Sequence, residues 1–233
     1  MVNTKYRTRE VELMDDFTMT GKLLANTLDQ LANINKWLGG NSITLSGLKK
    51  LLKNESKSRP ITIIDLGCGN GDMLRKVADY GKKQGYDFKL IGIDANEYTV
   101  NYANKLSQDY KEISYLQQDV FSNQFKNLNY DIVLSTLFLH HFSEEEIVTL
   151  LSLVLKKSTI GIIVNDLHRH AMAYYLFELL CLTIKNQMIK KDGLISILRG
   201  FKRVDLERIS KKLNVDIYIK WKWAFRYQWI IRK

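Results

Sequence analysis

The sequence contains few of the residues that stabilise small secreted proteins. Its 233 residues include two cysteines, Cys68 and Cys181, and one proline, Pro60. Two cysteines cannot form a framework of several disulfides, and the first residues, MVNTKYRTRE, lack the apolar core of a signal peptide. We therefore expect a reducing environment and a cytoplasmic location.

Long hydrophobic runs are also missing. The longest apolar run extends from Ala171 to Ile184 and is interrupted by Glu178. A helix that crosses a bilayer needs about 20 consecutive apolar residues. The run is therefore expected to be a buried helix or a helix that lies on a surface, and a weak contact with a membrane surface stays open.

Acidic residues are outnumbered by basic ones, 25 against 35, which gives a net charge of +10. This excess makes nucleic acids and acidic membranes possible partners. The lysines occur as scattered pairs toward the ends of predicted helices, where cations interact favourably with the helix dipole. A solvated basic surface is favoured over a nucleic-acid groove.

The most informative segment of the chain extends from Ile61 to Asp94. The apolar run ITII is followed by Asp65 and a loop with glycines at 67, 69 and 71, then by a helical stretch and a second apolar strand, FKLIGI, that ends at Asp94. Glycines after a strand allow a tight turn and a close approach of the backbone to a ligand. An acid at the end of the next strand can bind ribose hydroxyls. Together they predict a nucleoside site.

The sequence DLGCGNGD at 65–72 resembles the first motif of class I S-adenosylmethionine (SAM)-dependent methyltransferases. A dinucleotide dehydrogenase would instead carry Gly-x-Gly-x-x-Gly, and residue 72 here is aspartate. The resemblance implies SAM as the cofactor, S-adenosylhomocysteine (SAH) as the product and no metal. It also implies an α/β, Rossmann-like fold with a seven-stranded, mostly parallel sheet in the order 3-2-1-4-5-7-6, in which the seventh strand is antiparallel.

Further residues match the family in the expected order. Asp119 and Val120, placed at the end of the third strand, resemble the motif in which a carboxylate accepts a hydrogen bond from the adenine amino group. The resemblance assigns cofactor binding to Asp65, Gly67, Cys68, Gly69, Gly71, Asp94, Ala95, Asp119, Val120 and Ser135.

The chain reads as one methyltransferase domain with additions. Residues 1–58 form a helical N-terminal cap, 59–166 the SAM-binding core, 167–202 a helical insertion or lid, and 203–233 a terminal helix and β-hairpin. In the cap, an apolar stripe from Leu23 to Leu38 predicts one helix that ends at Gly39-Gly40, and the sequence LSGLKKLL predicts a second. Similar caps and insertions enclose the acceptor in small-molecule methyltransferases.

Three residues are candidates for a general base. His140, Asp166 and His168 follow the fourth and fifth strands, at the carboxyl edge of the sheet where ligands of open α/β sheets bind. His141 is expected to have a structural role. A metal site is not expected, because the chain has four histidines and His168 and His170 are predicted to lie on divergent sides of a helix.

The acceptor is predicted to be a small, lipophilic or aromatic molecule. Methylation at oxygen is favoured, and transfer to carbon or nitrogen stays open. The resemblance is to the ubiquinone/menaquinone-type and polyketide-tailoring enzymes. The sequence does not decide whether the chain forms a homodimer.

Two other hypotheses remain. The first is an RNA methyltransferase that uses the basic surface and the aromatic C-terminal strand, although residues 135–138 read Ser-Thr-Leu-Phe and not the Asn/Asp-Pro-Pro-aromatic motif of base-amine methyltransferases. The second is a SAM-binding scaffold or regulator without activity. The alternating aromatics between Trp221 and Trp229 are expected to be buried under helices in a terminal hairpin, with Arg226 near the mouth of the pocket.

Overall fold

The computed structural model describes residues 2–216 and 218–233. A single seven-stranded sheet, in the order β3-β2-β1-β4-β5-β7-β6, forms the middle of the molecule. All neighbouring strands are parallel except β7, which is antiparallel to both β5 and β6. The predicted strand order and the predicted direction of the seventh strand are confirmed. In chain order the strands are β1 (Ile61–Leu66), β2 (Phe88–Asp94), β3 (Ile113–Gln117), β4 (Ile132–Thr136), β5 (Gly161–Leu167), β6 (Tyr218–Lys222) and β7 (Arg226–Arg232).

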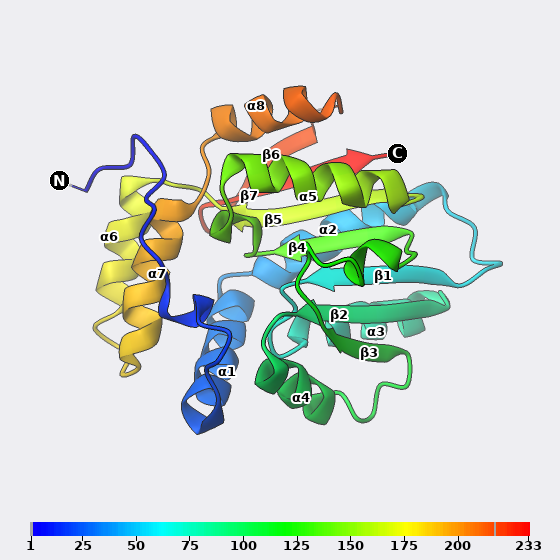
Figure 1. The fold of residues 1–233 in the computed structure, drawn as a ribbon, viewed down its shortest axis with the longest axis horizontal. Helices are drawn as coiled ribbons and strands as arrows, with labels where there is room; N and C mark the ends of the chain where they lie inside the picture. The colour runs from blue at the N-terminus through cyan, green and yellow to red at the C-terminus, as the bar shows by residue number, and fades with distance from the viewer. Residues whose placement is uncertain (1, 217) are drawn as a thin grey trace.

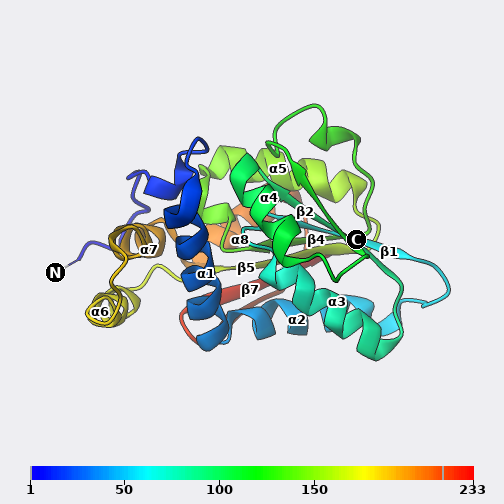
Figure 2. The ribbon, with the colours of Figure 1, turned by 90° about the horizontal axis from the view of Figure 1, so that it is seen from below.

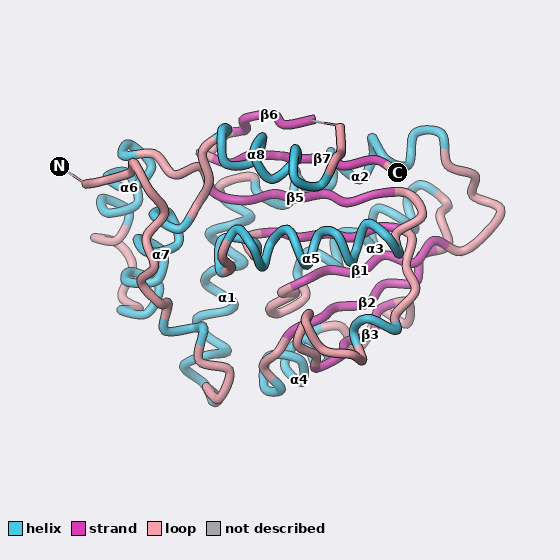
Figure 3. Tube along the Cα trace, turned by 45° about the horizontal axis from the view of Figure 1, so that its top comes forward, coloured by secondary structure: helices cyan, strands magenta, loops and turns pink. Residues whose placement is uncertain are grey.

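Helices cover both faces of the sheet, as Figures 2 and 3 show for α5 on one side and α2 and α3 on the other. Apolar side chains of α5 and α8 pack with β1, β4, β5 and β7 into one buried cluster, and those of α2, α3 and α4 form a second cluster on the opposite face. The helices of the core are α2 (Gly40–Leu51), α3 (Asp72–Gln84), α4 (Glu97–Leu106), α5 (Glu144–Lys157) and α8 (Arg203–Leu213).

Local sequence signals explain where several helices begin. The backbone N–H of Glu146 donates to the Ser143 hydroxyl at 3.2 Å and the Ser143 N–H donates to the Glu146 carboxylate at 2.8 Å, which is the predicted capping box of α5. Gly39 has a φ of +75° and separates α1 (Gly21–Trp37) from α2. The second helix therefore begins earlier than its leucine pattern suggested, because glycine permits this tight turn between two helices.

The first part of the cap, through α1, lies with the insertion beyond the carboxyl edge of the sheet (Figure 1), whereas α2 packs on a face of the sheet. The insertion consists of α6 (Ala171–Leu180) and α7 (Gln187–Arg199), and the first residues of the chain run across both helices. The N–H groups of Leu13 and Met14, in a short 3-10 turn, donate to the Asp192 carboxylate of α7 at 2.8 and 3.0 Å. Arg7 donates to the carbonyl of Arg199 at 2.6 Å. These bonds join the cap to the lid.

The prediction for the C-terminal aromatic residues is only partly correct. The predicted terminal hairpin is confirmed: a turn at 223–225 joins β6 to the antiparallel β7. Tyr227 and Trp229 on β7 are buried, as expected, but Trp221 and Trp223 are 47% and 65% exposed. Trp221 is exposed because β6 is the edge strand of the sheet, and Trp223 lies in the turn that follows it.

The predicted placement of His168 and His170 on one helix is wrong. His168 lies just after β5, where its N–H donates to the carbonyl of Phe225 at 2.8 Å, and it forms an isolated bridge with Phe201. His170 is the N-cap of α6. Because the chain between β5 and α6 is extended, the two rings lie 5.2 Å apart and do not diverge. In residues 2–216 and 218–233, no helix has the length and apolar character needed to span a bilayer.

Candidate active site

The glycine loop between β1 and α3 has the backbone that the motif predicts. Gly67, Gly69 and Gly71 all have positive φ values, of +64°, +53° and +77°. A Cβ atom at Gly67 would collide with the ring of Phe138, and one at Gly71 with the hydroxyl of Tyr115. At Gly69 the nearest atom to such a Cβ would be the Leu28 Cδ2 at 3.8 Å, so this glycine faces open space.

Asp94 lies at the end of β2 and points back toward the glycine loop. Its carboxylate accepts hydrogen bonds from the N–H of Gly69 at 3.2 Å and of Asn96 at 3.0 Å. Burial raises the pKa of Asp94, and hydrogen bonds from Asn96 and Gly69 oppose the shift. The side chain therefore orients the loop and remains available as an acceptor for a ligand.

Two other predicted residues carry buried polar atoms without a hydrogen-bond partner among the described residues, namely the Asp65 Oδ1 and the Ser135 Oγ. Burial, together with the nearby Asp72 and Asp94, raises the pKa of Asp65 well above its usual value. A buried polar atom without a partner is destabilising, and bound ligands or water commonly provide the missing partner. Asp65 also lines the cavity described below, so its free oxygen suits a donor on a ligand.

The loop after β3 forms the far side of the cradle. β3 ends at Gln117, earlier than predicted, so Asp119 and Val120 lie in the following loop. Asp119 is exposed and accepts from the N–H of Phe121 at 2.9 Å, whereas Val120 is buried. Residues from both the predicted cofactor set and the predicted catalytic set line a single cavity: Asp65, Gly67, Cys68, Gly69, Asp94, Ala95, Asp119, Val120, His140 and His168. Gly71, Ser135 and Asp166 lie outside its lining.

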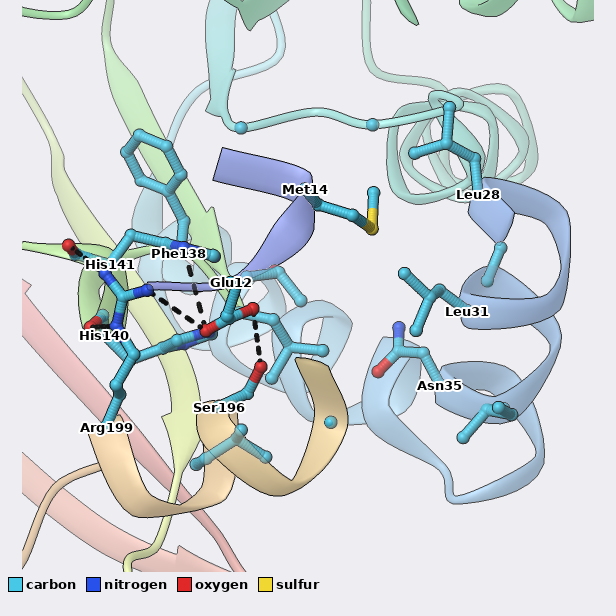
Figure 4. A pocket seen from close by; sticks show the side chains of 18 of the residues that line it. Glu12, Met14, Leu28, Leu31, Asn35, Phe138, His140, His141, Ser196 and Arg199 are labelled. Atoms are coloured by element: carbon cyan, nitrogen blue, oxygen red, sulfur yellow. Dashed lines mark hydrogen bonds and ion pairs between the residues drawn. The ribbon is translucent and has the colours of Figure 1, made fainter. Parts of the chain in front are cut away.

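This cavity has a volume of about 1150 Å³ and continues from the glycine loop to the space beneath the lid. Leu28 and Leu31 of α1 line one wall, and Leu176, Phe177 and Leu180 of α6 line another. Figure 4 shows the α1 side chains facing a polar group formed by Glu12, His140, His141, Ser196 and Arg199. Beneath the lid, the cavity is therefore an apolar chamber that faces a concentrated polar group.

His140 and Asp166 form a buried pair in that region. The His140 Nδ1 lies 2.7 Å from the Asp166 Oδ1, and the His140 backbone N–H donates to the other carboxylate oxygen at 3.3 Å. Burial acts to raise the pKa of Asp166, but the charge and hydrogen bond of His140 hold it below its usual value. Because an ionised Asp166 accepts the Nδ1 proton, the neutral tautomer of His140 that pairs with it has its free electron pair on Nε2.

Glu12 is a site residue that the sequence did not indicate. Its Oε1 lies 3.7 Å from the His140 Nε2, and its Oε2 accepts from the Ser196 hydroxyl at 2.8 Å. Arg199 lies 3.4 Å from the same carboxylate, and burial raises the pKa of Glu12. Glu12 belongs to the cap and Ser196 to α7, so the contact exists only after the chain has folded.

His141 is bound to the cap through Asp15, with its Nδ1 2.7 Å from the Asp15 Oδ1. Arg199 donates to the other oxygen of Asp15 at 2.6 Å. Burial acts to raise the pKa of Asp15, but these two partners hold it far below its usual value. The contacts fit the structural role that we expected for His141.

His168 also lines the cavity, but its ring is less suited to accept a proton. The Trp221 indole N–H donates to the His168 Nδ1 at 3.2 Å, which places the proton of the neutral ring on Nε2. Burial lowers the pKa of His168 to about 4, and His170, Arg169 and Lys202 act in the same direction. The Nδ1 of His168 is thus already occupied by Trp221, so His140 is kept as the candidate base.

The lowered pKa of His168 predicts a pH-dependent contribution to stability. Between about pH 6.5 and 4 the unfolded chain binds a proton at this residue and the folded chain does not, so stability falls as the pH falls through this window. His168→Asn keeps an acceptor for Trp221 and removes the titration. Between pH 7 and 4.5 the variant should lose about 1 kcal/mol less stability than the wild type, or about 2–4 °C of Tm, a value discounted for partial exposure. Equal losses measured by thermal unfolding would contradict the assignment.

Within residues 2–216 and 218–233, one group of side chains could hold a metal ion. Ligand atoms of Glu12, His140 and His141 lie within 4.8 Å of one another. The guanidinium of Arg199, 3.4 Å from Glu12, opposes a dication there. The absence of a metal stays a prediction: titration of the EDTA-treated protein with Zn²⁺ in a calorimeter should give no saturable binding at this group. Stoichiometric binding that disappears in His141→Ala would overturn it.

The chain is similar in sequence and in fold to known methyltransferases. Residues 57–212 match a protein-family model described as a methyltransferase domain. The chain therefore belongs to the methyltransferase-domain family. Its fold and glycine loop are those of the class I SAM-dependent methyltransferases, and SAM is the cofactor of that class.

Individual proteins match either a part of the chain or the whole chain at low sequence identity. A segment of 80 residues is 36% identical to the protein-lysine N-methyltransferase EFM4 of Saccharomyces cerevisiae, and it covers 33% of this chain and 33% of the yeast protein. The match thus spans about a third of that relative's length.

Solved structures resemble nearly the whole chain. The plantazolicin methyltransferase BpumL in complex with SAH has a TM-score of 0.68 at 16% identity, with 91% of this chain and 94% of that chain covered. The magnesium protoporphyrin IX methyltransferase of Synechocystis, also with SAH, has a TM-score of 0.52 at 15% identity, with 97% and 89% covered. At these identities the similarity shows the fold alone.

Proposed function

We propose that this protein transfers a methyl group from SAM to a small acceptor with an apolar or aromatic body, most readily at an oxygen atom. The observation that supports this proposal best is the single cavity that joins the open loop at Gly69 to the apolar chamber under α6 and α7. A cavity lined mainly by apolar side chains with a few polar groups is typical of small-molecule sites.

The cradle fits SAM in its chemistry. Asp94 offers acceptor oxygens for ribose hydroxyls, the free Asp65 oxygen offers an acceptor for the amino group, and Val120 offers an apolar surface for the adenine. Gly69 leaves open the space that a side chain would fill. Bound SAM supplies a methyl group that its positive sulfonium already makes electrophilic, so the chain has to orient the acceptor, exclude water and remove a proton.

His140 is the residue that we propose as the base. Asp166 fixes the ring and its tautomer through Nδ1, and Nε2 faces the side of the cavity where Glu12 lies. A hydroxyl of the acceptor near Nε2 can donate its proton there as the oxygen attacks. Among the described residues, Asp166 accepts hydrogen bonds from His140 and from the backbone N–H of Leu167 alone, and we assign it as a positioning residue.

Asp94→Asn tests the ribose assignment. The amide keeps an acceptor for one backbone N–H but loses the charge, so the affinity for SAM should fall by about 1–2 kcal/mol. Isothermal titration calorimetry measures this difference. Asp119→Asn, at an exposed position, should have a smaller effect, and unchanged affinity in Asp94→Asn would contradict the assignment.

The similarity to EFM4 favours a second candidate, transfer to a lysine side chain of a protein. The hypotheses of an RNA acceptor and of an inactive scaffold also stay open. Measuring SAH formation separates these hypotheses. The rate with small phenols and carboxylic acids is compared with the rates with unstructured lysine-containing peptides and with RNA. Preferential turnover with a peptide or RNA would contradict the small-molecule proposal, and no SAH with any acceptor would favour the scaffold.

Contact with a membrane surface remains part of the proposal for delivery of a lipophilic acceptor. On α6 and the turn after it, Met172, Leu179 and Leu182 are 57%, 63% and 79% exposed, and Leu179 also lines the cavity. An exposed apolar group at the mouth of a chamber suits an acceptor that partitions into lipid. Co-sedimentation with acidic lipid vesicles, and its reduction in Leu182→Ser, tests this contact.

A further inference from the structure

Arg226, the first residue of β7, is a buried cation that forms no salt bridge with the described residues. Its residue exposure is 3%, and neither its Nε nor its Nη1 has a hydrogen-bond partner within the described part of the chain. Burial lowers the pKa of Arg226 to about 10, with the Asp166 carboxylate opposing, so the side chain is charged at neutral pH. A buried charge with unpaired donors is destabilising, and proteins normally retain one only when a partner compensates it.

The position of Arg226 shows where such a partner would come from. Arg226 lines the cavity, as do Asn35 of α1 and Thr136 at the end of β4. Farther along the same strand, Gln228 donates to the Ile43 carbonyl and the Ser46 hydroxyl of α2 at 2.6 and 2.8 Å. Alternate residues of a strand share a face, so Arg226 lies on the α2 face, at the edge where the cavity opens.

This place is separate from the cofactor cradle. β7 is separated from β1, which carries the glycine loop, by β4 and β5. Three strand spacings of about 4.8 Å correspond to roughly 14 Å. The cradle already contains acceptor oxygens from Asp65 and Asp94, whereas the unpartnered nitrogens of Arg226 are donors that suit an anion.

We propose that Arg226 binds an anionic group of the acceptor, so that the substrate is a lipophilic or aromatic acid whose carboxylate pairs with the guanidinium. A planar carboxylate can accept from the free Nε–H and an Nη–H in parallel, the geometry that arginine recognises best. The apolar walls of α1 and α6 contact the rest of the molecule. The identity of the acceptor as an acid rests on the proposed function, but binding of the anion at Arg226 can be measured without methyl transfer.

The carboxylate could also come from the methionine part of SAM, and the experiment has to separate these two sources. We would titrate wild-type protein, with SAH present, with the probe acids benzoate, octanoate and 1-hydroxy-2-naphthoate and with their amides. At least one acid should bind tenfold or more tightly than its amide. In Arg226→Met this preference should disappear, while Lys220→Met, which removes a charge from the exposed surface, should keep it.

Two further readouts decide the role of Arg226. The affinity for SAH should change less than threefold in Arg226→Met, and the Tm of the unliganded variant should equal or exceed that of the wild type, because an uncompensated charge has been removed. A tenfold loss of SAH affinity would assign Arg226 to the cofactor. A lower Tm would assign it a structural role, and no preference for acids in the wild type would also overturn the proposal. Failure of SAH itself to bind the wild type would instead contradict the proposed function.

Discussion

His140→Asn should lower kcat by about 10²–10⁴, the usual contribution of a general base. The asparagine amide can still donate to Asp166, so the buried carboxylate keeps a partner and the fold should be retained. The asparagine side chain has no atom that accepts a proton at neutral pH. SAH formation with an acceptor that the wild type methylates, measured at saturating SAM, gives the comparison.

Two variants make this result specific. Asp166→Asn can donate to the His140 Nδ1 and so move the proton of the neutral ring to Nε2, which should cause a loss of similar size. His170→Asn changes an exposed histidine outside the cavity lining and should retain full activity. If His140→Asn kept more than a tenth of the wild-type kcat, the acceptor would need no base at this position.

Gly69→Asn should weaken SAM binding by at least about a hundredfold, or about 3 kcal/mol, because the new side chain projects into the open side of the cradle. Asparagine is chosen because Gly69 has a φ of +53°, a conformation that asparagine tolerates better than valine or alanine. Thermal unfolding without ligand should change little. Calorimetric titration with SAM measures the loss.

The chain contains a matched control for this substitution. Gly85, at the end of α3, has a φ of +71° and nothing within 4 Å of its virtual Cβ atom. Gly85→Asn introduces the same side chain into the same backbone conformation away from the cavity, and its SAM affinity should equal that of the wild type. Normal SAM binding by Gly69→Asn would mean that the loop does not hold the cofactor.

The fold could be predicted because its signals are local in sequence. The run ITII, the three glycines and Asp94 lie within one βαβ unit, and the chain order of the remaining strands follows the family pattern. The capping box at Ser143 fixed one helix boundary correctly. Errors occurred in the expected burial, as at Trp221 and Trp223, because periodicity alone does not show which strand lies at the edge of the sheet.

The polar part of the site could not be predicted in the same way. Glu12 and Ser196 form a hydrogen bond across a separation of 184 residues, and no spacing in the sequence indicates it. His140 and Asp166 were recognised because His140 follows β4 and Asp166 lies near the end of β5, at the same edge of the sheet. Their pairing and the role of Glu12 depend on how the cap and the lid pack, which is a property of the tertiary structure.

The most direct test of the whole account is a crystal structure with SAH. We predict SAH in the cavity, with its ribose on Asp94, its adenine beside Val120, and its sulfur directed toward the apolar chamber that contains His140 and Arg226. SAH bound elsewhere, or a cradle that stays empty at saturating SAH, would contradict the assignment of this cavity as the methyl-transfer site.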